Sequence, residues 1–141
     1  MAEAILNTLA QDADLGIRVE SAGVAALEGA EMDPKARAVL EEMGVYPGYH
    51  RARQVTRGLL DGADLVLTMS RRQSEQLLEN VGTTSGKIQT LLDYSNASGG
   101  GRGGIVDPHG RSLQAYRATS RELFGYIDSL AHHLASGTYS P

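Results

Sequence analysis

Residues 64–73, DLVLTMSRRQ, decide the fold class of this chain. The first six form a short apolar run, which is typical of a parallel strand buried on both faces. Ser70 is followed three residues later by Gln73, a capping-box pattern that predicts a helix running to Val81. A buried strand that leads directly into a capped helix indicates an α/β fold.

The rest of the chain alternates in the same way. The predicted helices cover residues 1–12, 33–44, 56–61 and 112–135, and the predicted strands cover residues 17–20 and 87–92. The second helix is the best marked, because Asp33 can cap it, Pro34 suits its first position and Gly44 suits a left-handed stop. This alternation predicts a doubly wound parallel sheet with helices on both faces, which binds ligands beyond the carboxyl ends of its strands. We expect a flexible loop over residues 97–104 and a frayed tail over residues 136–141.

Length and composition limit the function. A chain of 141 residues with 41% hydrophobic and 21% charged residues predicts one globular domain over residues 1–141. A net charge of −4 disfavours general binding to nucleic acid. The sequence has neither an apolar run long enough for a membrane span nor a signal peptide, so we expect a cytoplasmic protein that does not bind membranes.

The chain contains no cysteine, which excludes disulfides, zinc–thiolate sites and a cysteine nucleophile within these residues. His132 and His133 are adjacent on a predicted helix and point about 100° apart, so no metal site is predicted. Residues 99–104 have the spacing G-x-G-x-x-G, but they lead to Ile105 and an Asp-Pro pair rather than to a helix. A dinucleotide site is therefore excluded, and we expect no cofactor.

Asp107, Ser21 and His50 are the candidate site residues. Asp107 precedes Pro108 in the loop after the last strand, where it could donate a proton to a leaving group or simply form a turn. Ser21 follows the predicted strand 17–20 and could hydrogen-bond a site loop or serve a turn. His50 stands beside Arg51, and the pair could hold an anion or belong to a solvated loop.

The order of these motifs along the chain resembles that of the low-molecular-weight protein tyrosine phosphatase family. The matching stretches are Met1–Ile5, Val19–Gly23, Met32–Pro34, His50–Gln54, Ala63–Met69 and Asp107–Ser112 with Tyr116. The pattern Asp-Pro-x-Gly-x-Ser-x-x-x-Tyr is similar to that of the bacterial branch that includes protein arginine phosphatases. Thioredoxin-linked arsenate reductases share the fold and are a more distant match. The resemblance disfavours arsenate reduction, because its relay needs further cysteines.

The resemblance implies a hydrolase that removes phosphate from phosphotyrosine or phosphoarginine in proteins through a phosphocysteine intermediate. Asp107 matches the general acid and base of the family, and Ser21 and His50 match positions that brace its phosphate loop. His109 stands in the wall of the substrate site, where relatives usually carry an aromatic residue. The implied partners are phosphorylated proteins, and the sequence leaves the choice of substrate and the oligomeric state open.

This chain departs from the family pattern at its beginning. Family members carry a central strand and a Cys-x5-Arg-Ser-Pro loop before the residues that match Met1–Ala4, and neither is present here. We therefore expect an N-terminally truncated domain that has unpaired strand edges and is inactive. The first hypothesis is a longer phosphatase whose start was assigned to an internal Met, and the retention of Asp107, Ser21 and His50 favours it. The second is a non-catalytic binding domain of the same fold.

Overall fold

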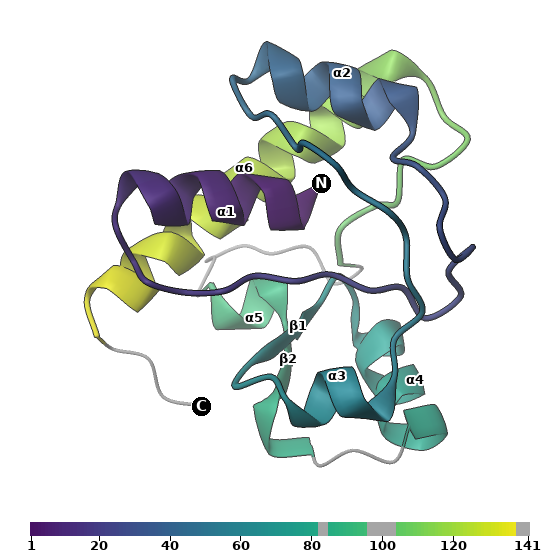
Figure 1. Cartoon of the computed structure of the whole chain (residues 1–141), viewed down its shortest axis with the longest axis vertical. Coiled ribbons are helices and arrows are strands. Elements are labelled where there is room, and N and C mark those ends of the chain that lie inside the picture. The colour runs from purple at the N-terminus through teal and green to yellow at the C-terminus, as the bar shows by residue number, and fades with distance from the viewer. Residues whose placement is uncertain (82–84, 96–103, 138–141) are drawn as a thin grey trace.

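The computed structural model describes residues 1–81, 85–95 and 104–137, and helices make up most of it (Figure 1). In chain order the elements are α1 (Ala2–Asp12), α2 (Pro34–Glu42), α3 (Arg57–Asp61), β1 (Val66–Thr68), α4 (Arg71–Val81), a 3-10 turn (Ser85–Lys87), β2 (Ile88–Thr90), α5 (Leu91–Tyr94) and α6 (Leu113–Ala135). The helices predicted from the sequence are all present.

The sheet consists of β1 and β2, which pair in parallel with Val66 opposite Ile88 and Thr68 opposite Thr90. Parallel strands need a crossover connection, and α4 provides it. Both strands are in contact with α4 and α5. The predicted α/β class and the parallel pairing of these two strands are therefore confirmed.

The strand predicted over residues 64–69 is shorter in the structure, where β1 covers only Val66–Thr68. Two further strand predictions need correction. Residues 17–20 have no regular structure and make no backbone–backbone hydrogen bond within the described ranges, because no described strand lies beside them as a partner. The strand predicted over 87–92 is confined to β2, since the Thr90 hydroxyl accepts a hydrogen bond from the Asp93 amide at 3.1 Å and starts α5. In the described part of the chain, β1 pairs with β2 on one edge only.

The predicted helix starts are confirmed by their caps. The Lys35 amide donates to the Asp33 carboxylate at 2.8 Å at the start of α2, and Gly44 follows that helix with φ of +78°. The Gln73 amide donates to the Ser70 hydroxyl at 3.3 Å, while the Gln73 side chain accepts from Met69 rather than from Ser70. The predicted loop 97–104 lies outside the described residues except for Gly104, and so does the tail from residue 138.

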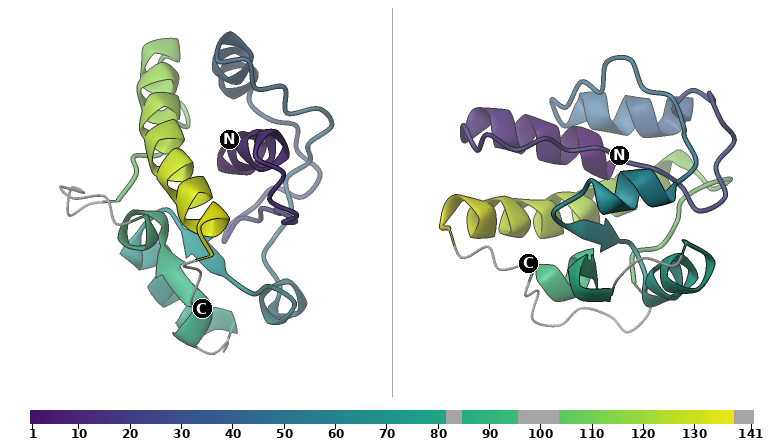
Figure 2. Two further views of the ribbon diagram at one scale, coloured as in Figure 1. Left: turned by 90° about the vertical axis from the view of Figure 1, so that its left-hand side faces the viewer. Right: turned by 60° about the horizontal axis from the view of Figure 1, so that its bottom comes forward.

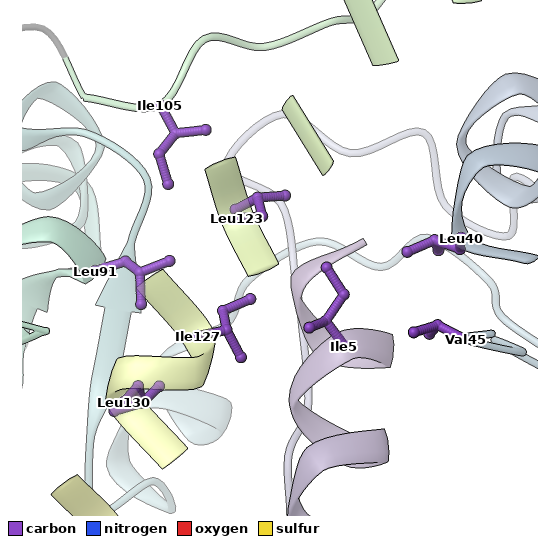
Figure 3. Close-up of a cluster of buried hydrophobic side chains, with 8 residues drawn as sticks. All are labelled: Ile5, Leu40, Val45, Leu91, Ile105, Leu123, Ile127 and Leu130. Carbon is purple, nitrogen blue, oxygen red and sulfur yellow. The ribbon is translucent and has the colours of Figure 1, made fainter. Parts of the chain in front are cut away.

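The core lies where α1 packs beside α6 (Figures 1 and 2). On α6, Leu123, Ile127 and Leu130 follow helical spacing and point inward. The complete cluster consists of Ile5, Leu40, Val45, Leu91, Ile105, Leu123, Ile127 and Leu130 (Figure 3). A smaller cluster of Ala36, Val39 and Tyr116 joins α2 to α6. These contacts fix the N-terminal end of α1 relative to both helices.

An ion pair also joins α2 to α6. The Arg117 guanidinium donates Nε–H to Glu42 Oε2 at 3.0 Å and Nη2–H to Glu42 Oε1 at 2.9 Å. This hydrogen-bonded guanidinium lowers the pKa of the Glu42 carboxyl. None of the helices in the described ranges is long and apolar enough to cross a bilayer.

Candidate active site

Ser21 and His50 are brought together by a third residue, Glu3. The Ser21 hydroxyl donates to Glu3 Oε2, and His50 Nδ1 lies 3.9 Å from the same oxygen. Glu3 lies in the first turn of α1, Ser21 follows α1 in an irregular segment, and His50 follows α2. Three distant stretches of sequence therefore meet at one carboxylate, which we call the Glu3 cluster.

Backbone hydrogen bonds fix the two loop members of the Glu3 cluster. The Gly23 amide donates to the Arg53 carbonyl at 2.9 Å, and the Val55 amide donates to the Gly23 carbonyl at 2.9 Å. The Arg53 side chain donates Nε–H to the Ser21 carbonyl at 2.9 Å. The segment that carries His50 is thus joined along its length to the segment that carries Ser21.

Asp107 lies in the loop that leads into α6, and its carboxylate is held by a turn. Asp107 Oδ1 accepts a hydrogen bond from the His109 amide at 3.0 Å, and the Arg111 amide donates to the Pro108 carbonyl at 2.9 Å. Asp107 Oδ2 makes no hydrogen bond to any described residue, and both Asp107 and His109 are exposed. The turn that Asp-Pro predicts thus leaves one carboxylate oxygen available for proton transfer.

Beneath this loop lies the phenol of Tyr116, which is 3% exposed. Burial raises the pKa of Tyr116, and the carboxylates of Asp33, which shares a hydrogen bond with it, and of Asp107 raise it further. The Lys35 ammonium donates to the Arg111 carbonyl at 2.8 Å. The start of α2 therefore supports the Asp107 loop through both contacts.

Met1 connects the two groups of residues. It packs against the Tyr116 cluster and lines a cavity together with Glu3 and His50. Burial lowers the pKa of its amino group. The N-terminal end of α1 is therefore next to both groups, although no hydrogen bond or ion pair between described residues joins Asp107 to Ser21 or His50.

The sequence did not point to Glu3 or to a supporting role for Tyr116. An acidic residue in the first turn of a helix is usually explained by its favourable interaction with the helix dipole. The sequence therefore offers no reason to expect that Glu3 also contacts Ser21 and His50. Tyr116 fits the apolar stripe of α6 and is simplest to assign to the core. Both roles depend on partners far away in the sequence.

Nothing in the part of the chain that the structure describes gathers three or more His, Asp or Glu side chains in a geometry suited to a metal ion. The arrangement offers instead a positioned carboxylate at Asp107 and a hydrogen-bonded cluster at the end of α1. A carboxylate such as that of Asp107 can donate or accept a proton.

Comparison with known proteins identifies relatives along most of the chain. Residues 1–138 match the family model described as low molecular weight phosphotyrosine protein phosphatase. A protein-arginine-phosphatase of Geobacillus stearothermophilus is 36% identical over 119 residues, which are 84% of this chain and 78% of that protein. The low molecular weight protein-tyrosine-phosphatase Wzb of Escherichia coli K12 is 35% identical over 102 residues, which are 72% of this chain and 66% of that protein.

The fold is similar to solved structures of the same group. A mutant of the YwlE arginine phosphatase with a phosphorylated active-site serine superimposes with a TM-score of 0.87 and 32% identity, covering 94% of this chain and 85% of that one. In that relative the active site therefore carries phosphate on a side chain.

Proposed function

This chain belongs to the low molecular weight phosphotyrosine protein phosphatase family, and we propose that its site serves the hydrolysis of phosphotyrosine or phosphoarginine in proteins. The observation that carries this proposal is the turn at Asp107, which holds one carboxylate oxygen and leaves the other available. The Glu3 cluster supports it, since Ser21 and His50 meet at the end of α1 as the resemblance requires.

The chemistry divides into two displacements at phosphorus. A nucleophile attacks the phosphorus atom, and the bond to the leaving oxygen or nitrogen breaks while Asp107 donates a proton to the leaving atom. Water then attacks the phosphoenzyme, Asp107 takes a proton from that water, and phosphate leaves. Asp107 thereby returns to its protonated state at the end of each cycle. In this scheme Ser21 and His50 orient the loop that carries the nucleophile.

The resemblance assigns the nucleophile to a cysteine, and these 141 residues contain none. We therefore propose that this chain by itself is inactive, and that the activity requires a Cys-x5-Arg loop next to the end of α1. The same observation favours the second candidate function, a non-catalytic binding domain of this fold. For the phosphatase the proposed partners are phosphorylated proteins, and the proposed location is the cytoplasm.

Grafting the absent loop tests the first function against the second. The N-terminal segment of the G. stearothermophilus protein-arginine-phosphatase, up to the residue aligned with Met1, is fused to this chain. We expect the chimera to hydrolyse p-nitrophenyl phosphate with saturation, because the remaining groups are already positioned. The ratio of kcat/KM for phosphoarginyl and phosphotyrosyl peptides then gives the substrate preference.

The matched control is the same chimera with the grafted cysteine replaced by serine, which is expected to lose turnover. Circular dichroism confirms that both chimeras fold. A folded chimera without turnover would support the non-catalytic domain and contradict the proposed phosphatase.

A further inference from the structure

A cavity of about 360 Å³ lies between α1 and the loop of residues 46–50. This volume is at the lower end of the range for small-ligand sites and suffices for one long side chain. The α1 wall contributes Glu3, Asn7 and Gln11, and the loop wall contributes Tyr46 and Tyr49. The cavity shares Glu3 and His50 with the Glu3 cluster and extends along α1 beyond that cluster to Gln11.

The α1 wall presents hydrogen-bond acceptors to which no described residue donates. Glu3, Asn7 and Gln11 follow one another at a spacing of four and therefore share a helix face. Glu3 uses Oε2 for Ser21 and His50, and its Oε1 bonds to no described residue. The side-chain amides of Asn7 and Gln11 likewise make no hydrogen bond to a residue within the described ranges. This wall thus offers a carboxylate oxygen and two amide oxygens in a row.

The loop wall presents two exposed aromatic rings. Tyr46 is 75% exposed and Tyr49 is 85% exposed. The guanidinium carbon of Arg51 lies 4.3 Å from the centroid of the Tyr49 ring, so this ring already holds a guanidinium on one face. The loop is preorganised, because the Arg37 guanidinium donates to the Gly48 carbonyl at 2.9 Å and Gly48 has φ of +63°.

We propose that this cavity binds the side chain of an arginine in a partner protein. A guanidinium is planar and carries five donors, so it can bond to a row of acceptors and stack on a tyrosine at the same time. The ammonium of lysine is a compact charge that cannot stack in this way. Of the neighbouring cations, Arg51 is paired with Glu31 at 3.0 Å, which offsets part of its repulsion of an incoming guanidinium.

Titration of the 141-residue chain with acetyl-arginine amide, followed by NMR, tests this proposal. We expect saturable shifts of the Asn7, Gln11, Tyr46 and Tyr49 amide resonances. Acetyl-citrulline amide has nearly the same shape as acetyl-arginine amide but carries no charge. Acetyl-lysine amide keeps the positive charge but has no planar guanidinium group. Both are expected to bind at least about fivefold more weakly, since a charged, stacked guanidinium contact is worth roughly 1 kcal/mol.

Two variants locate the site. Gln11→Ala removes an acceptor and Tyr46→Ala removes an exposed ring, and each is expected to weaken binding by about two- to fivefold. Gln114→Ala, an exposed glutamine on α6, is the control and leaves binding unchanged. Absence of saturable shifts, equal binding of citrulline, or shifts confined to other residues would overturn the proposal. Binding is measured without turnover, so this outcome is independent of the proposed phosphatase function.

Discussion

Asp107→Asn lowers kcat of the chimera about 10²- to 10⁴-fold, the usual scale for losing a general acid. Asparagine keeps the Oδ1 acceptor for the His109 amide, so the turn is retained. It removes the proton that the leaving atom requires and the base that the attacking water requires. KM is expected to change far less than kcat, because the interaction lost is made in the transition state.

The matched control is Asp93→Asn, which neutralises an exposed carboxylate on α5 and leaves kcat unchanged. Steady-state kinetics with p-nitrophenyl phosphate compares both variants with the parent chimera. If Asp107→Asn keeps the parental kcat while chemistry limits the rate, Asp107 is not the general acid.

We expect Gly104→Ala to destabilise the chain by about 2–4 kcal/mol. The residue has φ of +77°, a conformation that costs a residue with a Cβ roughly 1–2 kcal/mol. A Cβ at this position would also lie 2.6 Å from the Met69 carbonyl oxygen and 3.0 Å from Ser70 Cβ. The Ile105 amide donates to that same Met69 carbonyl at 3.0 Å. The clash would therefore disrupt the hydrogen bond through which the segment before Asp107 contacts the residue that follows β1.

Urea unfolding followed by circular dichroism measures this loss. Gly125→Ala is the control, because Gly125 lies inside α6 with nothing within 4 Å of a new Cβ. This control is expected to stabilise the chain by about 0.5–1 kcal/mol through helix propensity. A Gly104→Ala variant as stable as the parent would show that the loop does not approach β1 as described.

The features that sequence predicts well are local. Asp33 and Ser70 each cap a helix through an amide two or three residues further on, and the sequence shows both residues of each contact. The strand predicted over residues 17–20 is wrong because a strand depends on a neighbour, which a local pattern does not reveal. The boundary between β2 and α5 was placed incorrectly because the Thr90 cap overrides the apolar run that follows it.

In the candidate site, too, some residues could be predicted from the sequence, whereas contacts between residues distant in the sequence could not. Asp107, Ser21 and His50 could be identified as candidates because their order along the chain resembles a family pattern. The local sequence around each of them fits a turn or a solvated loop equally well. Glu3 joins Ser21 and His50 across gaps of 18 and 47 positions in the sequence, so only the structure shows its role. Tyr116 resembles a core residue in sequence, and its proximity to the Asp33 and Asp107 carboxylates appears only after folding.

The measurement that most directly tests the central claim is hydrolysis of p-nitrophenyl phosphate by the purified 141-residue chain. We propose that this chain is a phosphatase scaffold with Asp107 as its general acid, and its 141 residues include no cysteine nucleophile. This proposal predicts a rate equal to that of the buffer control at every substrate concentration. Saturable turnover that follows the chain through purification would contradict it.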